Sequence, residues 1–526
     1  MTGIALELFI IILLILVPLA FFLYLYLFDA KQTQHAVLRN YPVLGKVRYI
    51  LEKIGPEMRQ YLFDHDTEGK PFSREDYQNV VLPAKYLTNM ISFGSKRDFD
   101  REGYFIRNAM FPKQREEMRV DNTVLIDTKK YKIIDDDLFK RKEQFIDAKA
   151  KPWLLTEEDA IVIGPNCRNP FVVRGQIGMS GMSYGALGNR AITALSNGLG
   201  MAQGTWMNTG EGGLSPYHLK GGVDIILQIG PGLFGVRTKD GKMDFEELKR
   251  KAEIPQVKAI ELKLAQGAKT RGGHLEGSKV TPEIAEIRKL EPWKTADSPN
   301  RFQEFHDIPS MFQFISQIRE VTGLPVGIKI VVGNVSDLES LADFMKKTGE
   351  GPDFITVDGS EGGTGATYQE LADSVGLPIK PAIMLLHRTL IKYGVRDRVK
   401  IIASGKLFTP DRIAVALGMG ADLVNIARAF MMTVGCIMAQ RCHTNTCPVG
   451  VATTDPKLQK ALVIEEKQYR VLNYLLTLRE GLFTTAAAAG VSSPVELNAS
   501  HVAYQDDKGR IYSLDQLFDH YLQEIS

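Results

Sequence analysis

The sequence has 526 residues, 44% of them hydrophobic, and a formal net charge of +2. This length exceeds one small domain, and the balanced charge argues against a nucleic-acid partner, which would favour a basic chain. Four cysteines are too few for a disulfide framework. Three of them lie within residues 436–447, which indicates a reducing compartment and metal or cluster chemistry.

The first predicted element is an uncharged apolar run at residues 8–28. It matches the roughly 20 residues that a helix needs to cross a bilayer, and Tyr24 and Tyr26 near its end are typical of a membrane interface. We interpret it as a single-pass membrane anchor rather than a cleaved signal peptide, because no basic segment precedes it and no small-residue cleavage site follows. Positive charges begin at Lys31, so the positive-inside rule predicts a cell-membrane protein with residues 29–526 in the cytoplasm.

Beyond the anchor, which we assign to residues 1–30, we predict three further parts. Residues 31–150 are charged and mixed, carry no glycine pattern and suggest no particular role. Residues 151–500 form the predicted main domain, and residues 501–526 form a C-terminal tail.

The main domain contains eight short β-rich runs. They are residues 175–180, 201–207, 224–230, 259–265, 326–332, 353–359, 399–404 and 422–427. Helices are predicted between them at residues 186–199, 244–252, 308–323, 335–349, 382–394 and 410–420. Apolar strands alternating with helices indicate a parallel sheet covered on both faces, and eight repeats predict an α/β fold, the (β/α)₈ TIM barrel. The competing doubly wound sheet would need a G-x-G-x-x-G motif after an early strand, and none stands there.

Polar residues just beyond the runs are candidate site residues, because a barrel builds its active site from the loops at the C-terminal ends of its strands. Glu211 follows the second run between glycines, although an exposed acid in a glycine-rich turn would look the same. After the fourth run come Gln266, Lys269, Arg271 and His274, which could bind an anion or form a loose basic loop.

Three later runs add further candidates. Lys329 lies inside the apolar fifth run, and because a buried lysine is costly without an anion we predict that it contacts a ligand. The sixth run ends in the glycine-rich segment 358–367. Loops after strands 7 and 8 often bind phosphate in such barrels, which makes Ser404, Gly405 and Arg428 phosphate candidates, with a surface arginine as the alternative for Arg428.

Cys436, Cys442 and Cys447 directly follow the eighth run, so we expect them on the face of the active site. A structural zinc site usually has four ligands, often in closely spaced cysteine pairs, and the wider spacing here fits that pattern poorly. His443 could complete a zinc set, but it is adjacent to Cys442. We favour a three-iron cluster, which needs three thiolates, and interpret the remote Cys167 as a plain thiol.

Five segments occur in an order that resembles the FMN-binding central domain of the glutamate synthase large subunit. They are GMSYGALG (181–188), NTGEGG (208–213), QGAK (266–269), DGSEGGTGA (358–366) and CIMAQRCHTNTCPVGVATT (436–454). The resemblance covers about residues 150–500. It implies a TIM barrel that binds FMN and a three-iron, four-sulfur (3Fe-4S) cluster, the cluster held by Cys436, Cys442 and Cys447.

The resemblance also implies an activity. Electrons from a donor such as ferredoxin or a separate reductase would pass through the cluster and FMN to 2-iminoglutarate, formed from 2-oxoglutarate and ammonia, and give L-glutamate. It implies catalytic roles for Glu211, Lys269 and Lys329, with Lys329 near the N1 and O2 edge of the flavin. The predicted substrate contacts are Gln266, Lys269, Arg271 and His274. The predicted cofactor contacts are Ser180, Met182, Lys329, Asp358, Gly362, Gly363, Thr364, Ser404, Gly405, Lys406, Ala427 and Arg428.

Two departures from the family pattern leave the substrate open. The family loop reads K-P-G-E-G-G-Q, whereas here Lys269 is followed by TRGGH, one residue shorter and with His274 where a glutamine is expected. The segment NIARAF (425–430) replaces a Gly-Thr pair. The alternatives are the same cofactors acting on another 2-oxo, 2-hydroxy or amino acid, or a membrane electron-transfer or redox-sensing protein without turnover. We also expect neither a glutaminase domain nor a C-terminal β-helix, so that ammonia would come from elsewhere.

Overall fold

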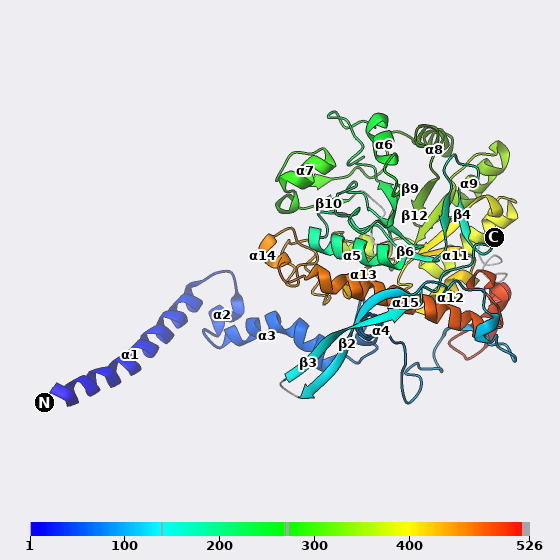
Figure 1. The fold of residues 1–526 in the computed structure, drawn as a ribbon. Helices are drawn as coiled ribbons and strands as arrows, with labels where there is room; N and C mark the ends of the chain where they lie inside the picture. Colours follow the sequence, from blue (N-terminus) through cyan, green and yellow to red (C-terminus); the bar gives the residue numbers. More distant parts are fainter. Residues whose placement is uncertain (1, 138–139, 268, 270–272, 518–526) are drawn as a thin grey trace. The chain divides into compact units, whose positions relative to one another are not determined.

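The computed structural model describes residues 2–137, 140–267, 269 and 273–517. The chain divides into two compact units, residues 1–78 and 79–526, and each has its own internal contacts. Figure 1 follows both units along the sequence.

The first unit is helical. It contains α1 (Thr2–Lys31), α2 (Ala36–Asn40), α3 (Gly45–Met58) and the π-helical turn η1 (Arg59–Phe63). The stretch Phe9–Lys31 of α1 has a mean hydropathy of 2.9, so this helix is long and apolar enough to cross a membrane. Its last turn is fixed to the start of α3, because the buried Asp29 carboxylate accepts hydrogen bonds from the Val43 N–H at 2.9 Å and from Lys46 Nζ at 2.7 Å.

The second unit is built on a closed barrel, which confirms the predicted fold class. Its strands are β6 (Ile177–Met179), β7 (Trp206–Asn208), β8 (Asp224–Ile229), β9 (Val257–Lys263), β12 (Val326–Ile330), β13 (Phe354–Asp358), β14 (Lys400–Ser404) and β15 (Leu423–Ile426). Neighbouring strands are parallel throughout, and the pairing of β15 with β6 joins the last strand to the first. All eight strands therefore point their C-terminal ends to the same side of the barrel.

The second predicted strand was placed too early. Residues 201–202 belong to α5 (Asn189–Ala202), and β7 begins only at Trp206. Met201 and Ala202 are good helix formers, so the helix continues through them. The chain leaves the helix at Gln203 and Gly204, both of which have a positive φ (55° and 61°).

The end of the barrel where the strands begin is closed by aromatic rings. Trp206 and Phe354 are fully buried there and pack in one cluster with residues of neighbouring strands. Two glycines make room for these rings: a Cβ on Gly178 would lie 2.1 Å from the Trp206 ring, and a Cβ on Gly327 would lie 2.5 Å from the Phe354 ring. The glycines in the first and fifth predicted runs are therefore packing positions.

Helices surround the barrel in Figure 1. They include α6 (Phe245–Ala252), α8 (Ile308–Thr322), α9 (Val335–Thr348), α11 (Ile379–Lys392) and α12 (Pro410–Gly418), close to the predicted ranges. Local signals explain their ends: Asp307 caps the start of α8, and Gly323 and Gly349 end α8 and α9 with φ near 70°. Short helices in the connections are α7 (Pro282–Arg288), α10 (Gln369–Ser374), α13 (Arg428–Thr433) and α14 (Pro456–Gln459).

The long helix α15 (Ile464–Ala488) packs against α5 and α12. Its buried Arg479 donates hydrogen bonds to the carbonyl oxygens of Pro152, Ala202 and Gln203, and so joins the C-terminal end of α5 to the segment at Pro152. The remaining elements are α4 (Arg74–Tyr86), the hairpin β2 (Ile126–Asp137) and β3 (Lys140–Ala150), the pair β4 (Ile161–Ile163) and β5 (Phe171–Val173), the pair β10 (His274–Leu275) and β11 (Ala296–Asp297), and the sheet of β1 (Gly103–Ile106), β16 (Val502–Gln505) and β17 (Ile511–Ser513).

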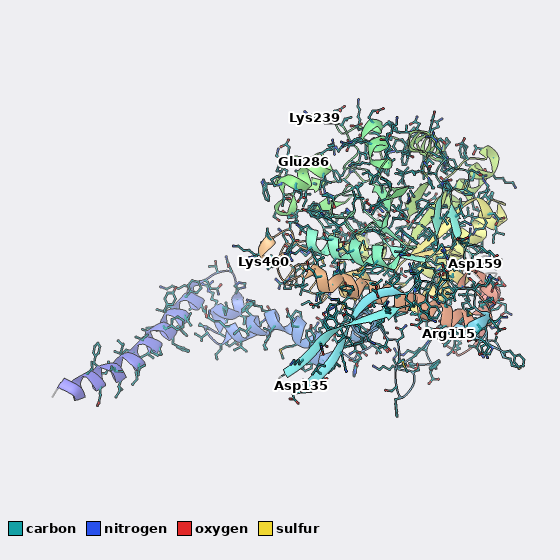
Figure 2. All side chains as sticks on the ribbon, in the orientation of Figure 1. Arg115, Asp135, Asp159, Lys239, Glu286 and Lys460 are labelled. Atoms are coloured by element: carbon teal, nitrogen blue, oxygen red, sulfur yellow. The ribbon has the colours of Figure 1, made fainter. Side chains whose placement is uncertain are left out.

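The outer surface of the second unit carries charged side chains. Lys239 and Glu286, for example, are exposed and point away from the interior in Figure 2. The informative polar groups are the buried ones, and several of them lie at the C-terminal ends of the barrel strands.

Candidate functional site

A buried carboxylate, Glu261, lies inside the barrel on β9. It accepts hydrogen bonds from Asn208 Nδ2 at 2.8 Å, Gln228 Nε2 at 2.6 Å and Thr356 Oγ1 at 2.5 Å. These neutral donors come from β7, β8 and β13, so the carboxylate ties three other strands to its own. Two residues further along β9, Lys263 reaches the end of the strand.

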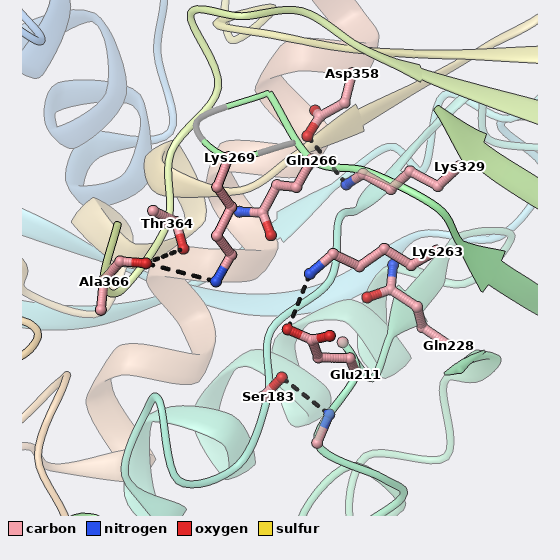
Figure 3. Close-up of polar contacts among 12 residues, drawn as sticks. Ser183, Glu211, Gln228, Lys263, Gln266, Lys269, Lys329, Asp358, Thr364 and Ala366 are labelled. Atoms are coloured by element: carbon pink, nitrogen blue, oxygen red, sulfur yellow. Dashed lines mark hydrogen bonds and ion pairs between the residues drawn. The ribbon is translucent and has the colours of Figure 1, made fainter. Parts of the chain in front are cut away.

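Lys263 forms an ion pair with Glu211. Its Nζ lies 3.0 Å from Glu211 Oε1, and both side chains are largely buried (Figure 3). Burial raises the pKa of Glu211, but the charges of Lys263, Lys269 and Arg288 outweigh it, so the net shift is downward and Glu211 is ionised at neutral pH. Glycine makes room for this carboxylate, because a Cβ on Gly230 would lie 2.4 Å from Glu211 Oε2.

Two further cations lie near Glu211. Lys269 is buried, and burial together with the charge of Lys263 lowers its pKa to about 8, although Glu211 acts in the opposite direction. Arg288, at the end of α7, is buried as well, and burial lowers its pKa to about 10. Its Nη2 donates to the Tyr184 carbonyl at 3.0 Å, while its buried Nε has no hydrogen-bond partner among the described residues. An unpartnered buried N–H next to other cations suits an anionic ligand.

A second ion pair joins β12 and β13, the two strands that follow β9 around the barrel. Lys329 on β12 has its Nζ 3.3 Å from Asp358 Oδ2 on β13 and 3.4 Å from Ser180 Oγ after β6. The same carboxylate oxygen of Asp358 accepts a hydrogen bond from the Gly267 N–H at 2.8 Å. Asp358 therefore connects Lys329 to the loop that carries Gln266 and Lys269, as the labelled side chains in Figure 3 show.

Together these side chains form what we call the charged cluster: Glu211, Glu261, Lys263, Lys269, Arg288, Lys329 and Asp358. Among the described residues it holds four cationic and three anionic groups, all of them largely buried. The excess of positive charge attracts an anion, and the amide of Gln266, which donates to the Gly363 carbonyl at 2.5 Å, links the cluster to the glycine-rich segment after β13.

The predicted cofactor residues lie along the same end of the barrel. Met182 follows β6, and its N–H donates to the Asn208 carbonyl at 3.1 Å. Gly362, Gly363 and Thr364 follow β13, where the Thr364 hydroxyl donates to the Ala366 carbonyl at 3.3 Å. Ser404 ends β14 and is followed by Gly405 and Lys406, both with positive φ (152° and 48°), while Ala427 and Arg428 begin α13.

Arg428 is largely buried, and burial lowers its pKa, against the charges of Asp358 and Glu361. It donates to the Glu361 carbonyl at 2.5 Å and lies over Gly363, where an added Cβ would be 2.6 Å from Arg428 Nε. The arginine therefore faces the glycine-rich segment and not the outer surface.

The structure does not place the predicted substrate residues His274 and Arg271 in the charged cluster. His274 is half exposed on β10, with its Nδ1 2.7 Å from Asp297 Oδ1 and its Nε2 3.6 Å from Glu276 Oε2. These partners are exposed carboxylates rather than members of the charged cluster. Arg271 lies outside the described residues.

The three cysteines share one loop after α13. Burial raises the pKa of Cys436 to about 11. The Met438 N–H, 3.4 Å from its Sγ, opposes this shift, and the charges of Cys442 and Cys447 add to it. Among the described residues no three His, Cys, Asp or Glu side chains stand close enough to hold a metal ion as they are. The loop is tightly folded, with positive φ at Met438 (60°) and elsewhere.

Sequence reasoning missed Glu261, Lys263 and Arg288. The first two had a signal, since the fourth predicted run (259–265) reads AIELKLA, with two charged residues at alternate positions of an apolar segment, the pattern that identified Lys329. Arg288 had a weaker one: it shares one face of α7 with Ile284 and Ala285, which are buried.

The chain belongs to the glutamate synthase family: the family model described as a conserved region in glutamate synthase matches residues 114–492, which confirms the predicted family. Among its relatives is the glutamate synthase large subunit-like protein YerD of Bacillus subtilis, 60% identical over 495 residues and covering 94% of each chain. The archaeal-type glutamate synthase [NADPH] of Thermotoga maritima is 36% identical over 56% of this chain and 55% of its own. The archaeal glutamate synthase [NADPH] of Methanocaldococcus jannaschii is 34% identical over 59% and 58%.

This chain therefore spans most of the YerD protein but only a little over half of the archaeal-type relatives. Among solved structures, a flavocytochrome b2 variant with sulfite bound aligns with a TM-score of 0.43 at 15% identity, over 76% of this chain and 75% of its own. This similarity is too low to support an argument about function.

Proposed function

We propose that this protein is an FMN and iron–sulfur oxidoreductase that reduces 2-iminoglutarate, formed from 2-oxoglutarate and ammonia, to L-glutamate. The observation that carries the proposal is the charged cluster, in which Lys263, Lys269 and Arg288 surround Glu211 beside the Lys329–Asp358 pair. A substrate with two carboxylates would bring the negative charge that these buried cations lack.

The residues at the strand ends fit FMN. Lys329, with its Nζ near Ser180 Oγ, offers a positive charge for the ring system, and the buried Arg428 beside Gly363 offers one for a phosphate. The residues that would hold the group are Ser180, Met182, Lys329, Asp358, Gly362, Gly363, Thr364, Ser404, Gly405, Lys406, Ala427 and Arg428. FMN, when bound, supplies the hydride chemistry that side chains cannot.

The cysteine loop fits a three-iron cluster. Cys436, Cys442 and Cys447 would supply its three thiolates, and their place within residues 436–447 of one loop supports a shared site. A bound 3Fe-4S cluster would accept single electrons from a donor such as ferredoxin or a separate reductase.

The side chains of the charged cluster have distinct tasks in this proposal. Arg288 and Lys269 bind the substrate carboxylates, and Gln266 holds the loop that carries Lys269 against Gly363. Lys263 keeps Glu211 ionised, so that this carboxylate can attract ammonium to the site. Lys329 would offer a positive charge to the ring system of bound FMN.

A second candidate substrate class follows from the loop after Lys269. Arg271 and His274 stand in a segment one residue shorter than the family pattern, and His274 contacts Asp297 at the surface. The same cofactors could therefore act on another 2-oxo, 2-hydroxy or amino acid.

We also propose that α1 anchors the protein in the cell membrane with the second unit in the cytoplasm. The apolar stretch Phe9–Lys31 and the absence of positive charge before Lys31 support this orientation. Thiol labelling of the variants Thr2→Cys and Lys70→Cys in intact cells tests it. An impermeant thiol reagent should label the Thr2→Cys variant and leave the Lys70→Cys variant unlabelled.

The decisive experiment uses the full-length protein in detergent. Absorption and EPR spectra should show a flavin and a three-iron signal, and the protein reduced by dithionite should be reoxidised faster by 2-oxoglutarate with ammonia than by other oxo acids. Equal rates for unrelated oxo acids would favour the second substrate class. A reduced flavin that no oxo acid reoxidises would support electron transfer or redox sensing without turnover.

A further inference from the structure

Lys279 is a buried lysine that none of the roles above uses. It ends the short 3₁₀ helix η3 (Gly277–Lys279), and only 2% of its surface is exposed. Its Nζ donates hydrogen bonds to three carbonyl oxygens, those of Ala186 and Cys442 at 2.9 Å and that of Ala452 at 3.1 Å. The ammonium group is therefore fixed in one position by three acceptors.

These acceptors come from two different loops. Ala186 belongs to the loop after β6 that also carries Met182, whereas Cys442 lies inside the cysteine loop and Ala452 follows its last cysteine. The single ammonium group thus joins the cysteine loop to the loop predicted to contact FMN. Carbonyl oxygens satisfy its N–H groups, but they do not neutralise its charge.

In the described part of the chain, Lys279 forms no ion pair with a carboxylate. A buried ammonium without a counter-charge is costly, and the buried cations Lys263 and Lys329 both have a carboxylate partner. Its Nζ lies against the loop that carries the three cysteines, 2.9 Å from the Cys442 carbonyl oxygen and 3.1 Å from the Ala452 carbonyl oxygen. The loop that would hold the negatively charged cluster is therefore the one that this ammonium group contacts.

We propose that Lys279 is the fixed counter-charge of the iron–sulfur cluster and raises its reduction potential, while it joins the cysteine loop to the loop after β6. This inference rests on the cluster assigned in the proposed function. Three thiolates and a sulfide-bridged iron core carry net negative charge, and reduction by one electron adds another. In a buried site a nearby cation favours the more negative state, so Lys279 acts through the cluster as a positioning residue.

Three substitutions separate the charge of Lys279 from its hydrogen bonds. Lys279→Gln keeps an amide donor but removes the charge, Lys279→Arg keeps the charge, and Lys279→Met removes both. The control is Lys251→Met on α6, because Lys251 donates to the Gly235 carbonyl at 2.5 Å and has its own carboxylate partner, Glu247, at 3.5 Å. The readouts, on full-length protein in detergent, are iron and flavin content and an EPR-monitored redox titration with dithionite.

We expect the glutamine variant to retain iron and to lower the ratio of reduced to oxidised cluster at least tenfold at a fixed potential, a shift of about 59 mV for one electron. Lys279→Arg and Lys251→Met should titrate like the wild type. Lys279→Met should show the same lowered potential with less iron, because three carbonyl groups lose their donor. If glutamine and methionine both lose the iron while arginine keeps it, the charge is needed for the cluster itself, which also supports the inference.

An unchanged potential in Lys279→Gln would overturn the inference and leave Lys279 as a structural link only. Loss of iron in all three variants, arginine included, would also contradict it, because charge would then not be the deciding property. Wild-type protein that contains flavin but no iron would instead refute the cluster assignment in the proposed function, and the counter-charge role would fail with it.

Discussion

The two ends of the barrel are made from the same strands but follow different rules. On β7, Trp206 fills the apolar end and Asn208 binds the buried Glu261; on β13, Phe354 fills the apolar end and Asp358 pairs with Lys329. Two to four residues along one strand separate a packing role from a charged one. At the apolar end a substitution destabilises the fold mainly by leaving a cavity. At the charged end it does so mainly by leaving a buried charge without its partner.

The largest effect should come from emptying the apolar end. Trp206→Ala should lower the free energy of unfolding by about 3–5 kcal/mol, because a fully buried ring is replaced by a cavity. The matched control is Trp293→Ala, since Trp293 is 61% exposed and should cost far less. Denaturation followed by circular dichroism measures both. Equal losses in the two variants would contradict the packing role of Trp206.

Removing an ion pair at the charged end should lower the free energy of unfolding slightly less than Trp206→Ala does, but it should reduce catalytic activity more. Lys263→Met leaves Glu211 buried without its nearest cation, which should cost about 3 kcal/mol and raise the pKa of Glu211. Lys392→Met, which breaks an exposed pair with Glu339, should cost under about 1 kcal/mol. The double variant Lys263→Met with Glu211→Gln should recover part of the stability in urea denaturation but no turnover. A double variant as unstable as Lys263→Met alone would argue against the coupling.

The pH dependence of substrate binding sharpens the comparison further. Lys269 has a pKa of about 8, so the KM for 2-oxoglutarate should rise about tenfold per pH unit above that value as the lysine loses its charge. Lys269→Arg should remove this rise, and Lys269→Met should give a high KM at every pH. A KM that stays flat well above the pKa of Lys269 in the wild type would exclude this lysine as the titrating group.

Unfolding does not explain that rise, because the stability change has the opposite sign. The pKa of Lys269 is lower in the folded protein than the roughly 10.4 expected in the unfolded chain. Between these values the unfolded chain binds more protons, so the contribution of Lys269 to the free energy of unfolding increases with pH across this window.

The smallest effect on stability should come from His274, which lies at the surface outside the charged cluster. His274→Gln removes a contact with Asp297 between half-exposed and exposed side chains and should change stability by less than about 1 kcal/mol. Its useful readout is selectivity, measured as kcat/KM for a panel of oxo acids. If His274→Gln leaves the selectivity unchanged while Arg288→Met abolishes binding of all carboxylates, the charged cluster and not His274 recognises the substrate.

Sequence patterns were sufficient for the barrel because its strands are short apolar runs, most of them followed closely by glycine. They also identified Lys329, whose charge interrupts such a run, and Glu211, which follows one between glycines. They left Arg288 unidentified, because burial on one face of α7 is a weak signal and the approach of Arg288 to Glu211 depends on the tertiary fold. Nor could they pair Gly178 with Trp206, since that contact depends on β6 and β7 lying side by side, with Met179 opposite Met207.

At the apolar end, two glycines each lie against an aromatic ring, and these contacts restrict which substitutions the four positions can accept. A side chain at Gly178 is incompatible with the indole of Trp206, and one at Gly327 is incompatible with the ring of Phe354. Either position can accept a larger residue only when its partner shrinks in the same lineage. We therefore expect substitutions at each pair to arise together among homologous sequences.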